Sequence, residues 1–278
     1  AAGREAAPVA GTSAWNGRPV TWRRSLSEVP PGPMVLLAHE LFDALPVHQL
    51  KKTELHGWCE RLVDVADHDS PEHLQVKLSK GVSIMPKLLL AARLATVPEH
   101  VKSSIDTLEV SPQAWTLVQD IANRVSEHSG AALLMDYGRE GPLGDSLQAI
   151  RRHEFVDLLD DPGGADLSAH VDFGALREAV NSGPGKNAVS YGPVTQSELL
   201  HALGISARLE ALLQKASPEE RKVLEYGFRR LVSTDECVDD QGNTFPGMGE
   251  SYKALAITSA EVGAPPGFAA QESTPETE

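Results

Sequence analysis

Two carboxylates three residues apart, Glu40 and Asp43, directly follow the apolar run 34–38. Ligands bind at the carboxyl ends of strands in open α/β sheets, so a strand over 34–38 would place both side chains on a functional rim. If the chain turns helically there, the two share a face and could clamp a guanidinium through charge-assisted hydrogen bonds. An acidic first helical turn with an ordinary cap is the alternative, and the residues themselves leave both interpretations open.

A second acidic strand end is predicted at Asp136-Tyr137-Gly138, after the apolar run 131–135. Asp136 could bind a hydroxyl group of a substrate or cofactor, or it could cap the following turn. Tyr137 could stack on a ligand or simply pack against its neighbours. The strand-end rule predicts that these side chains lie on the same rim as Glu40 and Asp43.

His170 and Asp172 form a third candidate group, because a histidine near a carboxylate can act as an acid/base pair. A purely structural histidine is the alternative. Asp172 is also placed to cap a helix over 173–180, because aspartate is a preferred residue before the first helical turn.

The bulk composition limits the class of partner. The 278 residues carry a net charge of -14, which argues against nucleic acid and suits a basic partner such as an arginine-bearing protein segment, although solubility alone could also explain it. The two cysteines are far apart and have no nearby ligands at metal spacing, so neither a disulfide framework nor a metal site is expected. No apolar run approaches the length of a membrane span.

Alternating elements predict an α/β fold with a doubly wound, mostly parallel sheet. Ser111 and Pro112 start a helix that Gly130 stops, and this helix separates the buried strands 34–38 and 131–135. Further strands are expected at 19–22, 58–65, 74–78 and 254–258, with 58–65 and 74–78 paired as a hairpin, and further helices at 173–180, at 195–203 stopped by Gly204, and from Pro218 to about Leu231.

Three segments are expected along the chain. Residues 1–14 are rich in alanine, glycine and proline and are predicted to be disordered or a linker. Residues 15–258 form the folded domain, and 259–278 form a disordered acidic tail.

An ordered set of short segments resembles one family, the MidA-like class I methyltransferases, which include a mitochondrial complex I assembly factor. The resemblance spans about residues 18–258, and the set is specific although each motif alone is weak. The segments are Ala38-His-Glu-Leu-Phe-Asp-Ala-Leu-Pro-Val-His48, 58–65, Glu109-Val-Ser-Pro112, 130–138, 145–149, His153, Asp166-Leu-Ser-Ala-His-Val-Asp-Phe173, Gln196, 203–205 and 248–250.

The resemblance implies a Rossmann-like class I methyltransferase fold with family insertions, and S-adenosyl-L-methionine as methyl donor. It implies a protein arginine N-methyltransferase that symmetrically dimethylates the 49-kDa-type core subunit of respiratory complex I and so supports complex I assembly in the mitochondrion. On this basis Glu40, Asp43, His170 and Asp172 are candidate catalytic residues, and Asp136 and Tyr137 are candidate cofactor-binding residues.

One departure from the family is expected to matter. The family's first strand and its glycine-rich turn, which hold the cofactor, have no counterpart in this sequence, which we expect to start near the third strand. The predicted domain is therefore incomplete at its N-terminus, the chain is expected to be a fragment, and the edge of the 34–38 strand is expected to be bare. The alternative function is a non-catalytic assembly or protein-binding factor that has lost its cofactor site.

Overall fold

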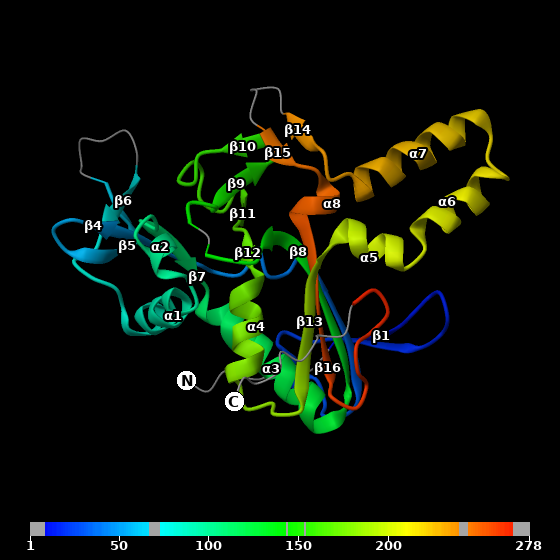
Figure 1. Cartoon of the computed structure of the whole chain (residues 1–278), viewed down its shortest axis with the longest axis horizontal. Coiled ribbons are helices and arrows are strands. Elements are labelled where there is room, and N and C mark those ends of the chain that lie inside the picture. The colour runs from blue at the N-terminus through cyan, green and yellow to red at the C-terminus, as the bar shows by residue number, and fades with distance from the viewer. Residues whose placement is uncertain (1–8, 67–72, 143, 153, 239–243, 269–278) are drawn as a thin grey trace.

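A mixed β-sheet organises the molecule (Figure 1). The computed structural model describes residues 9–66, 73–142, 144–152, 154–238 and 244–268. The central strand β8 pairs in parallel with β3 and with the short β12, and antiparallel with β16, which in turn pairs antiparallel with β13. The strands are β3 (Met34–His39), β8 (Gly130–Arg139), β12 (Val171–Asp172), β13 (Ala188–Thr195) and β16 (Tyr252–Ser259).

Helices α3 (Pro112–His128) and α4 (Phe173–Ser182) pack on one face of this sheet and form the main core. As predicted, Ser111 caps α3 by accepting a hydrogen bond from the backbone N–H of Ala114 at 3.2 Å. The apolar side of α3 is buried against the sheet because its apolar residues recur at helical spacing. Its buried residues are Ala114, Val118, Ile121, Ala122 and Val125.

The opposite face of the sheet is covered unevenly. Over β13 and β16 it is covered by α5 (Gln196–Ala202) and by Phe268, which form a second apolar cluster. On β3, however, the side chains of Val35 and Leu37 on this face are 90% and 66% exposed. The prediction that this strand is buried on both faces is therefore wrong, because no described element covers its second face or pairs with its outer edge.

The segment of the chain between the end of β3 and the start of α3 forms a separate four-stranded antiparallel sheet, in which the strand order is β6-β5-β4-β7. Helix α1 (Ile84–Ala95) packs on it through a third apolar cluster that includes Leu50, Leu90 and Leu108, and the short α2 (Glu99–Lys102) follows. The strands are β4 (His48–Thr53), β5 (Gly57–Val65), β6 (Leu74–Leu78) and β7 (Thr107–Val110).

Smaller sheets complete the described structure. Their strands are β9 (Gln148–Arg151), β10 (Glu154–Val156) and β11 (Asp166–Ser168) in one sheet, β1 (Val9–Thr12) with β2 (Pro19–Trp22) in another, and β14 (Glu236–Val238) with β15 (Thr244–Pro246) in a third. The remaining helical turns are η1 (Leu26–Glu28) and α8 (Met248–Ser251).

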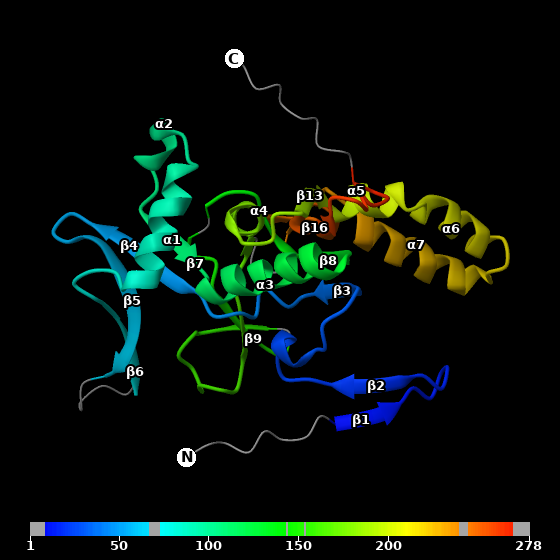
Figure 2. The ribbon, with the colours of Figure 1, turned by 90° about the horizontal axis from the view of Figure 1, so that it is seen from below.

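A helical hairpin extends from the sheet beyond α5, and both views show it projecting away from the rest of the molecule (Figures 1 and 2). It consists of α6 (Ile205–Leu213) and α7 (Pro218–Val232), and we call residues 205–232 the arm. Ser217 and Glu220 form a capping box at the start of α7. Gly204 was expected only to stop a helix, but it has φ 85° and also begins α6.

Most predicted elements are confirmed with boundaries shifted by a few residues, including the hairpin of β5 with β6. The two ends differ from the prediction. Residues 9–12 form β1 rather than a linker, and Phe268 packs against the sheet rather than belonging to a disordered tail. The flanking residues 1–8 and 269–278, on which the rest of those two predictions falls, lie outside the described residues.

Candidate functional site

The carboxyl end of β3 lies beside β8, because the parallel register places His39 opposite Met135. The strand end predicted at Asp136 is wrong, because β8 continues to Arg139 and pairs there with β12. The pairing continues into the loop after β3, where the backbone N–H of Glu40 donates to the carbonyl of Met135 at 2.9 Å. Glu40 and Asp43 are thereby brought to the same edge of the sheet as Asp136, as the strand-end rule predicts.

Asp136 is the buried anchor of this edge, with 1% of the residue exposed. Its Oδ2 accepts the backbone N–H groups of Phe42 at 2.9 Å and Asp43 at 3.2 Å, and its Oδ1 accepts that of Tyr137 at 2.9 Å. Burial and the nearby Asp43 raise the pKa of Asp136 to about 6. The carboxylate therefore holds the loop after β3 in place, a role that neither of the two alternatives described.

Asp43 presents an unused acceptor to the site. Its backbone N–H is bound by Asp136 and its carbonyl accepts the N–H of Ala169 at 2.9 Å, so the residue is fixed from two sides. Its carboxylate Oδ1 is buried and has no hydrogen-bond partner among the described residues. A buried carboxylate oxygen without a donor is costly and is relieved by a hydrogen-bonding cation.

Tyr137 lies between Asp43 and two other aromatic rings. Its hydroxyl contacts the side chains of Asp43, Ser168 and Gln148, and burial, the main cause, raises its pKa to about 12. The ring packs edge-on against His170, with centroids 5.2 Å apart, and against Tyr252 at 5.9 Å. Tyr137 is thus a neutral, ordered phenol at the rim.

Glu40 is held by a residue that the sequence analysis missed. The hydroxyl of Tyr252, at the start of β16, donates to Glu40 Oε1 at 2.9 Å. Glu40 itself has φ 50°, so the loop is not helical and Glu40 and Asp43 do not share a helix face as expected. The two carboxylates are joined instead through the contacting rings of Tyr252 and Tyr137.

A usable signal for Tyr252 did exist in the sequence. It lies two residues after the segment 248–250, which belongs to the family resemblance, and it precedes the predicted strand 254–258. A strand that runs antiparallel to its neighbours starts at the edge of the sheet where those neighbours end. Its first residue therefore lies on the rim. No local pattern in the sequence indicates its partner Glu40, which is 212 residues away.

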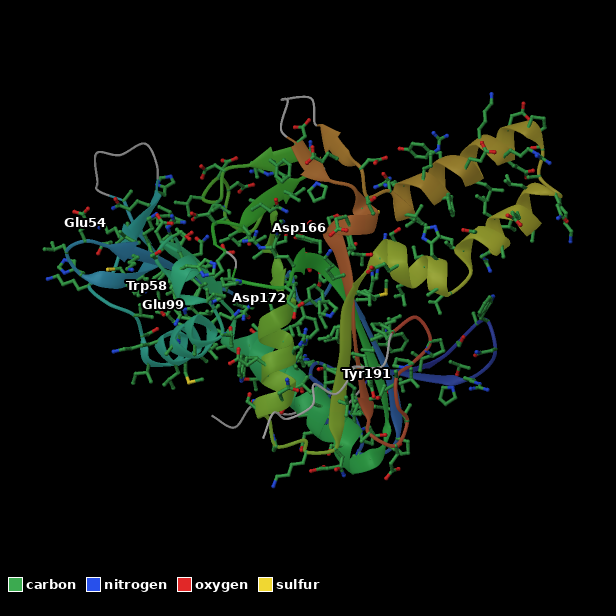
Figure 3. All side chains as sticks on the ribbon, in the orientation of Figure 1. Glu54, Trp58, Glu99, Asp166, Asp172 and Tyr191 are labelled. Carbon is green, nitrogen blue, oxygen red and sulfur yellow. The ribbon has the colours of Figure 1, made fainter. Side chains whose placement is uncertain are left out.

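Asp172 and His170 are not joined in the structure. The Asp172 carboxylate, at the start of α4 (Figure 3), accepts two hydrogen bonds from the Arg93 guanidinium, at 2.5 and 2.9 Å. It also caps α4 by accepting the backbone N–H of Ala175 at 3.1 Å. Burial raises the pKa of Asp172, and the Arg93 charge opposes that shift. Asp172 therefore links α1 to the main sheet, and its predicted catalytic role remains a prediction.

His170 faces the Tyr137 ring, and its backbone N–H donates to Ser146 Oγ at 2.9 Å. Part of the residue is exposed, but the packing around the ring disfavours the charged form and lowers its pKa. His170 and Asp172 both line a small cavity of about 60 Å³, together with Phe42 and Trp115. The side chain of His170 is therefore near the rim, and its predicted catalytic role also stays a prediction.

Two features are absent from the described part of the chain. There, no group of three or more His, Cys, Asp or Glu side chains is arranged to hold a metal ion. No described helix combines the length and the apolar character needed to cross a membrane.

Comparison with known proteins identifies relatives. Residues 4–192 match the family model described as "Putative S-adenosyl-L-methionine-dependent methyltransferase". The chain is 38% identical over 242 residues to the mitochondrial protein arginine methyltransferase NDUFAF7 of Xenopus tropicalis, covering 87% of this chain and 50% of that protein. The human protein of the same name is 36% identical over 243 residues, at 87% and 49% coverage. The chain thus spans about half the length of these relatives.

Solved structures share the fold. A crystal structure of an uncharacterized protein from Burkholderia thailandensis is 25% identical, has a TM-score of 0.66, and is matched over 88% of this chain and 60% of that one. A second structure from the same organism, bound to S-adenosyl-homocysteine, has a TM-score of 0.61 at 24% identity, with 84% of this chain and 56% of that one covered. The predicted fold class is therefore confirmed.

Proposed function

Because the chain belongs to the S-adenosyl-L-methionine-dependent methyltransferase family matched above, we propose that its site binds the substrate arginine of a protein arginine N-methyltransferase. The relatives carry that activity in their names, and this chain corresponds to about half of their length. The activity of the whole protein is part of this proposal.

The observation that carries the proposal is the unpartnered Oδ1 of Asp43 beside the ordered Glu40–Tyr252 pair. A guanidinium has five N–H donors in a rigid plane and stacks readily on aromatic rings. Asp43 and Glu40 supply acceptors, and the rings of Tyr137 and Tyr252 lie between them. This arrangement suits a planar cation held by charge-assisted hydrogen bonds.

The same acceptors would also help the chemistry. A carboxylate bound to one side of the guanidinium draws positive charge toward itself and away from the nitrogen that points outward. That nitrogen then becomes a better nucleophile at the moment of transfer. Asp136 contributes indirectly, because the two hydrogen bonds that it accepts from the backbone N–H groups of Phe42 and Asp43 fix the position of the loop that carries both carboxylates.

The cofactor fits the described residues less well. S-adenosyl-L-methionine supplies the methyl group in this family. Among the described residues no glycine-rich turn leads from a strand into a helix, so the backbone cradle expected for its amino-acid end is not found there. An open groove beside β3 is lined by Leu37, Leu41 and Arg24 and offers no such cradle. The assignment of Asp136 and Tyr137 to the cofactor therefore stays a prediction.

The finer biological assignments are also proposals. The relatives are named mitochondrial, which supports a mitochondrial location for this protein. We propose further that its substrate is the 49-kDa-type subunit of complex I and that it supports complex I assembly through symmetric dimethylation of an arginine. The support is the family resemblance together with the names of the relatives.

A titration tests the arginine site on the chain of residues 1–278. A short arginine-containing peptide is titrated by calorimetry, with the same peptide carrying lysine as the comparison ligand. We expect Asp43→Asn to weaken arginine binding by about tenfold or more, because a hydrogen bond to a charged group is lost. The matched control is Glu54→Gln, an exposed carboxylate in the β4–β5 turn that lies apart from the site (Figure 3).

Equal binding by the wild type and Asp43→Asn would contradict the proposal. The alternative, a protein-binding factor without a cofactor site, is favoured by the lack of a glycine-rich turn in the described residues. Calorimetry with S-adenosyl-L-methionine decides between them for this chain, because tight binding by residues 1–278 would exclude the alternative.

A further inference from the structure

The arm, residues 205–232, is poorly buried along its whole length. None of its residues is classed as buried, although it contains helices of 9 and 15 residues. It is attached at its base, where Gln196 Nε2 donates to the carbonyl of Leu231 at 2.8 Å and His201 packs edge-on against Phe228. Two short helices gain little from packing only on each other, so a covering partner would stabilise the arm.

The arm has an inner and an outer side. The partly buried pair Leu224 and Phe228 lies four residues apart on α7, as Leu209 and Leu213 do on α6, which is the spacing of a shared seam. Another stripe on α7 carries two exposed apolar residues, Val223 and Tyr226, which are 71% and 66% exposed.

The apolar pair on this stripe is flanked by opposite charges. Glu219, Val223, Tyr226 and Arg230 follow one another at spacings of four, three and four residues, which places them along one side of the helix. The stripe is therefore acidic at the start of α7, apolar in the middle and basic at the end.

This order is self-complementary in the antiparallel direction. When two copies of α7 run antiparallel, Glu219 lies opposite Arg230 of the second copy, and Val223 lies opposite Tyr226 of the second copy. A parallel pair would instead bring like charges together. A closed two-fold interface requires a patch that complements itself in this way.

We propose that two copies of this chain form a dimer through antiparallel packing of α7 against α7. The net charge of -14 opposes general association between copies, so association needs a locally complementary surface. The arm supplies one, since residues 205–232 carry six Lys or Arg against four Glu. The arm projects from the body, which leaves α7 accessible to a second copy (Figure 2). The proposal stands apart from the arginine site.

Sedimentation velocity of the chain over a range of concentrations tests this dimer. We expect a concentration-dependent dimer for the wild type. Glu219→Arg and Arg230→Glu should each weaken it by about tenfold, because two symmetric ion pairs become repulsive. The double variant Glu219→Arg/Arg230→Glu should restore it. Glu210→Arg on α6 is the control for an equal charge change off the stripe, and circular dichroism checks that each variant is folded.

Several results would overturn the proposal. A wild type that stays monomeric at every concentration would do so, as would single variants that dimerise normally or a double variant that fails to recover. A dimer that is lost in Leu37→Asp but kept in Glu219→Arg would place the interface at the exposed face of β3 instead of the arm.

Discussion

Strands β3 and β16 belong to the same sheet and have similarly apolar sequences, yet they differ in environment. On β16, Ala254, Leu255, Ala256 and Ile257 are all buried, so both faces are covered. On β3, the alternate residues Val35 and Leu37 are exposed. An apolar run therefore identifies a strand but does not report how many of its faces find a partner, because that depends on elements far away in the chain.

The sharpest contrast should come from truncating one leucine in each strand. Leu255→Ala leaves a cavity between the sheet and α3 and should lower the free energy of unfolding by about 4 kcal/mol. Leu37→Ala removes a side chain that is already mostly in solvent and should cost about 0.5 kcal/mol or less. Urea denaturation of both variants measures the difference, and equal losses would show that β3 is covered in solution.

The next prediction concerns the pH dependence of folding stability, to which Asp136 should contribute in the buried part of the sheet. The folded-state pKa of Asp136 is about 6, above its ordinary value of 3.8, so the folded protein holds this proton more tightly than the unfolded chain. This contribution to stability is complete below pH 4 and is lost as the pH rises through about 6, a change of about 3 kcal/mol.

Asp136→Asn should remove that part of the pH dependence, since the amide does not titrate. Denaturation series between pH 4 and pH 7 compare the variant with the wild type. Unchanged slopes in the two proteins would show that Asp136 titrates normally. Asp64→Asn, an exposed carboxylate on β5, serves as the control.

A smaller effect, on ligand binding, is expected from the hydrogen bond that connects the two strands. In this bond the hydroxyl of Tyr252, on β16, donates to Glu40, which follows β3. Tyr252→Phe removes one hydrogen bond of about 1 kcal/mol and should weaken binding of the arginine peptide about fivefold. Binding by Tyr252→Phe is measured calorimetrically beside Tyr226→Phe, a tyrosine outside the site. If both variants bind equally well, Tyr252 does not orient Glu40 for the ligand.

A charge on the exposed face of β3 should also change the folding stability only slightly. Leu37→Lys should alter the free energy of unfolding by only about 0.5 kcal/mol, while reducing aggregation, because an exposed apolar edge strand favours association. Light scattering at rising concentration measures aggregation, and Ile257→Lys is the buried counterpart that should not fold. A large loss of stability in Leu37→Lys would contradict the difference in exposure between β3 and β16.

Local signals predicted much of the fold. Ser111 and Pro112 fixed the start of α3, and the strand-end rule brought Glu40, Asp43 and Asp136 to one edge. Helix α1 was not predicted: it has no acidic residue in its first turn and its cap residue Ser83 makes no side-chain capping bond. Its stability comes from packing on the β4–β7 sheet, which is tertiary information.

The sequence predicted which residues make up the site, but it did not predict which of them bind to each other. Residue types and strand ends indicated which side chains gather at the rim. The bonds between them cross long sequence distances, as Arg93 does to Asp172 and Tyr252 to Glu40, and no local pattern encodes such partners. Asp172 is an example, because its carboxylate binds Arg93 of α1 and also caps α4.

The anchoring of the loop after β3 to Asp136 has a consequence for motion. β8 is hydrogen-bonded to neighbours on both of its sides, and such central strands exchange their amide protons only in rare, large openings. The amides of Phe42 and Asp43 bind a carboxylate on that strand, so their exchange should be slow for a surface loop. A site that is held by such a central strand selects ligands by the shape that it already has. Adapting to a different ligand would require the centre of the sheet to open.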